Sequence, residues 1–435
     1  MYLHNPDQST TVHIYEMRAT MEAAAASLPD DVVREIFMRV KDVADLFRCA
    51  MACKQWRRIM LSPSFLRHRR WPDHMSSLLT GFFIWEKISF GRGSTVLTSF
   101  IPTPRSVFSS DHWFLETFFS RATRARLENA VPLVARHGLL LVRLVVSSNS
   151  IVRLAVCNLL AGAYDELPPL KCNWEFKKSG YAILTKKNAK HGYPAFFKVL
   201  IIGTDRDHRP CNLHKFTSGE ATWSGPSSLF ASSDNKGRLT GNWLPLRDPR
   251  AVVCRGTAHW LICHCRGHDW SLHTIAVDAK TCSVSLTKIA IPAKHKRTEY
   301  YDEPQLIVHA GEKLSLLYLH RQGLRLEIWT RRQDEDGGRP AVWLCAAFVD
   351  LLKPPSWETT SVMDLTIVGE EGGVLLVKDD EWNMYAAELE TGVMVKLTSF
   401  KNINRRKVVP LAMDWTTFFV SRLGARKPRS RKPSS

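Results

Sequence analysis

Five turn signals recur at a nearly constant interval along most of this chain. They lie at positions 162, 219, 281, 338 and 392, separated by 57, 62, 57 and 54 residues. Each is flanked by short apolar runs typical of strands, and each interval holds a strand, a hairpin and another strand. Such a repeat restricts this part of the chain to an all-β architecture of similar consecutive units.

A period near this length, with several strands in each unit, is typical of the blades of a β-propeller. The segment 71–146 has its clearest strand at Gly138–Val146 and could supply one or two further blades. We therefore expect a propeller of six to eight blades over residues 71–420. A β-sandwich or an unrelated repeat array is the alternative.

Residues 27–70 follow a helical pattern instead. Apolar residues recur at three- and four-residue spacing in three successive runs, which begin near Val32, Val43 and Cys53. Ser27 and Asp42 are candidate N-caps, and Ser62–Pro63 should end the last run. The pattern predicts a three-helix module, and hence an α+β multidomain protein. Because so few residues bury little surface, the module should pack against a partner or another domain.

Three phrases in this module carry a family resemblance: LPDD at 28–31, ADLFR at 44–48 and CKQWR at 53–57. Together they resemble an F-box, although Ala52 stands where that family more often has valine. The resemblance implies docking onto the Skp-type adaptor of an SCF ubiquitin ligase. The implied adaptor-binding residues are Leu28, Pro29, Val32, Ile36, Leu46, Cys53 and Trp56. The alternative is an ordinary helical hairpin of a larger domain.

The β-rich region carries a weaker resemblance. AVCN at 155–158, a glycine turn and LPPL at 167–170 are similar to the F-box-associated domain common in plant F-box proteins. That resemblance implies a platform whose loops bind a protein substrate. The whole chain then resembles a non-catalytic subunit that links a substrate to the adaptor and, through it, to cullin, in the nucleus or cytoplasm.

The net charge of +18 supports a second interpretation. Residues 401–435 contain ten Lys or Arg against Asp414 alone, and we expect the tail 421–435, like the segment 1–26, to be disordered. A basic scaffold with a degenerate F-box, binding nucleic acid or an acidic surface, is therefore the alternative function. The first twenty residues do not resemble a secretory signal, and no apolar run is long enough to span a membrane.

The sequence offers little for catalysis. Cys263-His264-Cys265 lacks the spacing of a zinc site, because adjacent strand residues point to opposite faces, so His264 faces away from the two cysteines. Asp379–Asp380 and Glu370–Glu371 are expected in solvated hairpin tips, and most tryptophans between the blades. We expect no catalytic residues, metal or cofactor. A propeller enzyme is the weakest interpretation.

Overall fold

The computed structural model describes the helices and most strands of the chain, which separate into two compact units. The described residues are 28–40, 46, 49–50, 52–68, 78–90, 93–103, 127, 130–145, 151–159, 162–171, 179–187, 194–204, 210–229, 242–243, 250–266, 269–290, 304–309, 313–320, 324–332, 342–354, 357, 365–399 and 408–413. One unit contains the helices. The other contains the strands, within Leu79–Ala189 and Pro194–Met413. The predicted disordered segments 1–26 and 421–435, and the predicted caps Ser27 and Asp42, lie outside the described residues.

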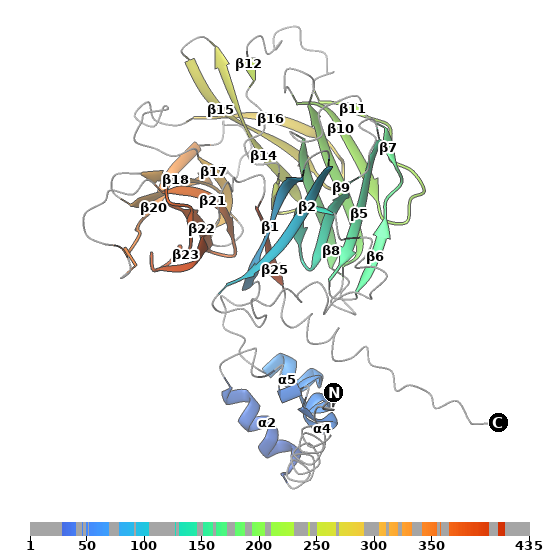
Figure 1. Ribbon diagram of the computed structural model, residues 1–435, viewed down its shortest axis with the longest axis vertical. Helices are drawn as coiled ribbons and strands as arrows, with labels where there is room; N and C mark the ends of the chain where they lie inside the picture. Colours follow the sequence, from blue (N-terminus) through green and yellow to red (C-terminus); the bar gives the residue numbers. More distant parts are fainter. Residues whose placement is uncertain are drawn as a thin grey trace, which may run out of the picture. The chain divides into compact units, whose positions relative to one another are not determined.

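The strands form six antiparallel sheets, the blades of a β-propeller (Figure 1). Blade 1 contains β3 (Val131–Arg136), β4 (Leu139–Leu144), β5 (Ile151–Asn158), β6 (Ala163–Glu166) and β7 (Leu170–Lys171). Blade 2 contains β8 (Gly180–Lys187), β9 (Pro194–Thr204), β10 (Pro210–Thr217) and β11 (Ser227–Ser228). Blade 3 contains β12 (Asn242–Trp243), β13 (Val252–Cys254), β14 (Thr257–Arg266), β15 (Asp269–Asp278) and β16 (Val284–Ile289).

The remaining blades come from both ends of the strand region. Blade 4 contains β17 (Gln305–His309), β18 (Lys313–His320), β19 (Arg325–Arg332) and β20 (Val342–Asp350). Blade 5 contains β21 (Thr366–Glu371), β22 (Val374–Lys378), β23 (Asn383–Glu388) and β24 (Met394–Ser399). The sixth combines β1 (Leu78–Phe90) and β2 (Gly93–Pro102) with β25 (Val408–Met413), which joins β1. We call it the closing blade.

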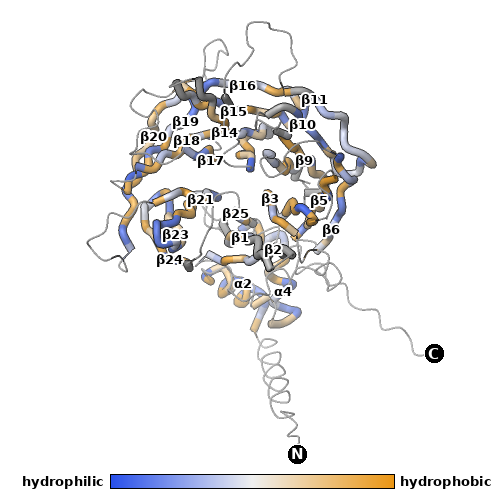
Figure 2. The backbone as a smooth tube through the Cα atoms, turned by 45° about the horizontal axis from the view of Figure 1, so that its top comes forward, coloured by the Kyte–Doolittle hydropathy of each residue, from blue (hydrophilic) through white to orange (hydrophobic). Residues whose placement is uncertain are grey.

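The inner strands of neighbouring blades contact one another around a ring (Figure 2). β25 contacts both β3 and β21, so the last strand joins the first complete blade to the fifth. The propeller is thus closed by pairing strands from the two ends of the β region. Six is the lower end of the predicted blade number.

The predicted turns mark the same place in successive blades. Gly162, Gly219, Thr281 and Gly392 each lie between the third and fourth strands of a four-strand meander, which confirms the repeat register. Position 338 falls between β19 and β20, outside the described residues. Residues 71–146 supply most of one further blade, as predicted, because β1 and β2 are two of the three strands of the closing blade. The clearest predicted strand, Gly138–Val146, instead contributes β4 to blade 1, beside β3. Local periodicity does not reveal that these strands complete blades elsewhere.

Apolar clusters fill the contacts between successive blades. Trp260 is fully buried between blades 2 and 3, and Trp329 and Trp343 are buried between blades 3 and 4. Such large rings bury much apolar area, so they stabilise the packing of one blade on the next. For these three residues the predicted structural role is confirmed.

The helical unit contains α2 (Asp30–Arg39), α4 (Lys54–Met60) and α5 (Pro63–His68). α2 begins after Pro29, with two acidic residues in its first turn. α4 ends at Met60, so the predicted end of the last run before Ser62–Pro63 is confirmed. The sequence did not predict α5: the Ser62 hydroxyl accepts a hydrogen bond from the Phe65 N–H (3.2 Å), and α5 begins at Pro63. Proline suits a first helical turn because its missing N–H would be unpaired there anyway.

Candidate partner-binding surface of the helical unit

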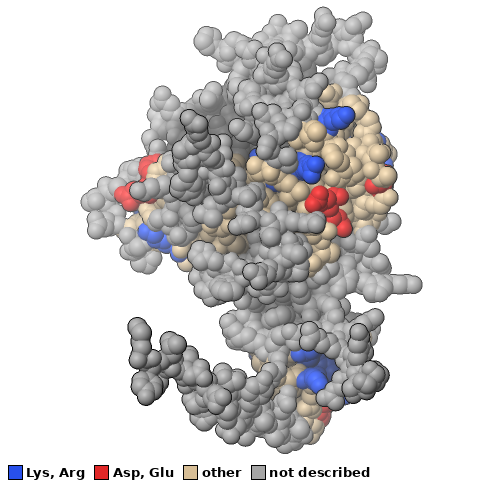
Figure 3. Space-filling view, turned by 45° about the vertical axis from the view of Figure 1, so that its right-hand side comes forward, with Lys and Arg blue, Asp and Glu red and all other residues tan. Residues whose placement is uncertain are grey.

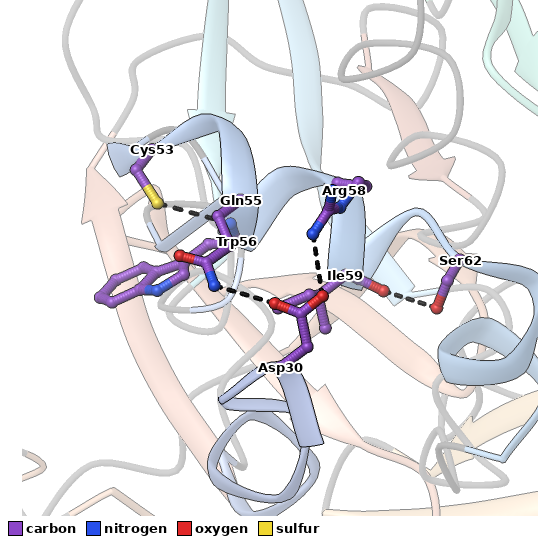
Figure 4. Close-up of polar contacts among 7 residues, drawn as sticks. All are labelled: Asp30, Cys53, Gln55, Trp56, Arg58, Ile59 and Ser62. Atoms are coloured by element: carbon purple, nitrogen blue, oxygen red, sulfur yellow. Dashed lines mark hydrogen bonds and ion pairs between the residues drawn. The ribbon is translucent and has the colours of Figure 1, made fainter. Parts of the chain in front are cut away.

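Asp30 fastens the start of α2 to α4. Its carboxylate accepts hydrogen bonds from Gln55 Nε2 and from the Arg58 guanidinium, both at 2.8 Å (Figure 4). The hydrogen bond from Gln55 and the charge of Arg58 lower the pKa of Asp30, so the carboxylate stays ionised at neutral pH. These contacts fix the direction in which α2 presents its side chains.

α2 buries one face and exposes apolar side chains on another. Val33 and Phe37 are buried, whereas Leu28, Val32 and Ile36 have exposed fractions of 40%, 41% and 47%. Val32 and Ile36 lie one turn apart on α2, and together with Leu28 just before the helix they form an apolar stripe, which water solvates poorly. The stripe is a candidate contact surface for another protein.

A shallow groove of about 370 Å³ runs along this stripe. Its lining includes Val32 and Ile36 and three charged residues, Asp31, Glu35 and Arg39. Arg39 and Glu35, one helical turn apart, form an ion pair at 3.1 Å. An apolar centre with a charged rim is the usual composition of a protein–protein contact.

The predicted adaptor-binding residues divide into two groups. Leu28, Pro29, Val32 and Ile36 are exposed at the start of α2 or along it. The other three support the fold, as the next contacts show. The adaptor-binding role of all seven residues stays a prediction.

Leu46 is fully buried in the helical core. Cys53 caps α4, since its Sγ accepts a hydrogen bond from the Trp56 N–H at 3.4 Å. Trp56 packs edge-on against Phe37, with ring centroids 5.3 Å apart. In this structure Leu46 therefore cannot contact a partner directly.

Sequence reasoning did not predict the contacts that join Asp30 to Gln55 and Arg58, because these residues lie more than twenty positions apart. The ion pair between Glu35 and Arg39 could have been predicted from their four-residue spacing.

Charged residues near the inner strands of the propeller form a second polar cluster. Arg136 Nη1 donates to the Val253 carbonyl (3.5 Å), which links blades 1 and 3, and Arg250 lies close to Gly369 of blade 5. Beside Gly369, burial and the neighbouring Glu371 raise the pKa of Glu370 to about 8. Burial also raises the pKa of Glu371. Both glutamates are half-buried at the β21–β22 hairpin, so the expected solvated tip was wrong for this pair.

Asp379 also departs from the expected solvated tip. It is buried and accepts hydrogen bonds from the Asn383 N–H and side-chain amide, both at 2.8 Å, and from the Tyr385 hydroxyl at 2.9 Å. Tyr385 in turn accepts from the Trp357 indole N–H at 2.7 Å. These contacts satisfy the carboxylate internally and indicate a structural role.

Other features of the described residues bear on alternative functions. Cys263 is buried between blades 3 and 4, and the described residues include no group of three His, Cys, Asp or Glu placed to hold a metal ion. In that part of the chain no helix has the length and apolar character needed to cross a bilayer. Lys and Arg, and Asp and Glu, occur in small separate groups on the face drawn in Figure 3, without a continuous patch of one sign among its described residues.

Comparison with solved structures gives distant similarities. A Penicillium chrysogenum α-L-arabinanase complexed with arabinobiose is 11% identical, with a TM-score of 0.33 and coverage of 78% of this chain and 98% of the arabinanase. Prolyl oligopeptidase B from Galerina marginata is 12% identical, with a TM-score of 0.35 and coverage of 81% and 50%. At these TM-scores the similarities support no argument about fold or function. No curated protein matches the chain in sequence.

The helical unit gives a specific family match. Residues 25–71 match the family described as F-box-like. The match covers the apolar stripe, helices α4 and α5, and the contacts of Asp30 with Gln55 and Arg58, which we call the clamp at Asp30. This chain therefore carries an F-box-like domain, followed by a six-bladed β-propeller.

Proposed function

We propose that this protein is a substrate-recruiting subunit of an SCF-type ubiquitin ligase. The single observation that supports the proposal best is the exposed apolar stripe of Leu28, Val32 and Ile36 within an F-box-like domain. F-box domains generally bind Skp-type adaptors. The stripe and its groove provide the apolar surface that such a contact buries, and the cullin is reached through the adaptor.

In this proposal the chain contributes proximity rather than covalent chemistry. The F-box-like domain binds the ligase, and the propeller binds a target protein, as in plant-type F-box proteins with an associated β domain. Tethering raises the effective concentration of the target's lysines near the charged ubiquitin-conjugating enzyme. Such a subunit needs no active-site residues of its own, and we place it in the nucleus or cytoplasm.

The proposal is tested by adaptor binding of the full chain. Val32→Asp combined with Ile36→Asp places two charges in the stripe without touching the helical core. Desolvating those charges should weaken binding to a purified Skp-type adaptor by about 100-fold or more, since a few central residues dominate such interfaces. The measurement is titration calorimetry at low and high salt.

Arg34→Ala is the matched control, because Arg34 is exposed on α2 but does not line the groove. It should leave the affinity for the adaptor unchanged. If binding were salt-labile and insensitive to the double substitution, contact through basic charge would explain it. The basic-scaffold function with a degenerate F-box would then replace the proposal.

A further inference from the structure

The outermost strand of blade 4, β20, has an unusual edge. It is nine residues long and ends its sheet, so no further strand pairs with its outer side in the described part of blade 4. Val342, Leu344 and Phe348 on this strand have exposed fractions of 50%, 46% and 54%. A long edge strand with exposed apolar side chains presents unpaired backbone groups beside a poorly solvated surface.

A β-bulge distributes these side chains over both faces of the blade. The register shifts where Trp329 pairs with Cys345 and Ile328 pairs with Ala347. Before the shift, Trp343 packs toward blade 3; after it, Ala347 packs toward blade 5. Because neighbouring strand residues point in opposite directions, Leu344 lies on the blade 5 side and Phe348 on the blade 3 side.

The outer strands of blades 1, 2, 3 and 5 are all shorter than β20. The outer strand of the closing blade, β2, is ten residues long and lacks charged residues, but its described side chains at 98–102 are partly buried. β6 has four residues and exposes Asp165 and Glu166, and β11 has two residues. β16 exposes Ser285 and Lys288, and in β24 the exposed Val395 is followed by Lys396. Short strands and charged side chains protect sheet edges against pairing with other chains. β20 lacks this protection over most of its length.

Among the described residues next to β20, the exposed charges are mainly basic. Arg332, paired with Val342, is exposed at one end of the strand, and Lys353 is exposed just beyond the other. The acidic residue of the strand, Asp350, forms an ion pair with Arg325 (3.3 Å), whose guanidinium lies 4.7 Å from the centre of the Phe348 ring. In the described part of blade 4, a cation therefore lies at each end of this apolar edge.

We propose that β20 is a docking edge for an extended segment of a partner protein, which adds to blade 4 as a fifth strand and carries apolar residues between acidic ends. A strand satisfies the outer backbone groups of β20 and can cover apolar side chains on both faces, whereas a helix would cover only one. Acidic ends match Arg332 and Lys353. The inference does not rest on adaptor binding.

The test uses the full-length protein and a fluorescent nine-residue peptide of alternating valine and threonine with a glutamate at each end. Fluorescence anisotropy should show saturable binding. Leu344→Lys and Phe348→Lys should each weaken it about tenfold or more, since each places a charge against the added strand. Hydrogen exchange should show added protection of β20 amides when the peptide is present.

Three controls separate strand addition from general adhesion. The same peptide N-methylated at alternate residues keeps its side chains but loses backbone donors, and should not bind. A peptide with lysine ends should bind more weakly at low salt, and this difference should shrink as salt screens the charges. Ser285→Lys on β16, with unchanged melting, should leave binding intact. Absence of saturable binding, equal binding of the N-methylated peptide, or equal weakening by Ser285→Lys would overturn the inference.

Discussion

Gly392 offers a sharp test of how blades 4 and 5 are joined. It has a φ of +71°, and a Cβ atom built on it would overlap the backbone carbonyl oxygen of Asp350. Its own carbonyl accepts a hydrogen bond from the Leu352 N–H (2.8 Å), beside an isolated bridge between Leu352 and Val393. Gly392→Ala should therefore strain the backbone and separate the two blades at this point.

Gly373 provides the matched control. Its φ is +80°, but a Cβ atom there would meet nothing within 4 Å. A left-handed conformation costs alanine about 1–2 kcal/mol relative to glycine at either site. At position 392 the overlap with backbone adds roughly 1–3 kcal/mol, as for overpacked cores. The difference between the two variants isolates the contact between the blades.

Thermal unfolding followed by tryptophan fluorescence measures this difference. For a propeller of roughly 330 residues, each kcal/mol should shift Tm by about 1.4 °C, so Gly392→Ala should melt roughly 1.5–4 °C below Gly373→Ala. Urea midpoints should follow the same order. Equal destabilisation would refute the reasoning, because backbone strain alone would then explain both variants.

Three further predictions concern buried groups. The pKa of Glu370 is about 8 in the fold, above that of an unfolded glutamate, so Glu370 contributes stability at low pH that is lost as pH rises toward 8. Glu370→Gln should therefore flatten the decline of Tm between pH 5 and pH 9. An unchanged slope would contradict this reasoning. Leu46→Ala should destabilise the helical unit by about 2–5 kcal/mol, seen as lost helical circular dichroism that Val32→Ala does not cause; equal loss would place Leu46 outside the core. Asp379→Asn should lower the urea midpoint by the equivalent of about 2–4 kcal/mol, because it removes an acceptor of buried hydrogen bonds, whereas the same change at exposed Asp380 should have little effect; similar losses would argue against the buried network.

Much of the propeller could be predicted because each blade is a local meander. Glycines at 162, 219 and 392 adopt positive φ at equivalent turns, so their spacing reports the repeat directly. The closing blade could not be predicted in the same way. β25 joins β1 across more than three hundred residues, and no local pattern encodes that pairing.

The candidate site shows a similar division. Val32 and Ile36 could be selected through the resemblance to an F-box, whereas their helical spacing alone does not separate them from the buried Val33 and Phe37. Leu46 could not be separated from Val32 and Ile36 by sequence, because an apolar residue at helical spacing fits a core and an interface equally well. The clamp at Asp30 and the half-buried Glu370 depend on tertiary contacts, which the spacing of residues does not report.

The closing blade sets an order for biosynthesis. Translation adds roughly 5–20 residues per second, so about 15–60 s separate the synthesis of β2 from that of β25. During this interval the helical unit has already been synthesised, while β1 cannot yet pair with β25. A nascent chain therefore exposes the apolar stripe of Leu28, Val32 and Ile36 before the ring can close. A chain truncated before Val408 should show this state as protease sensitivity confined to the strand region.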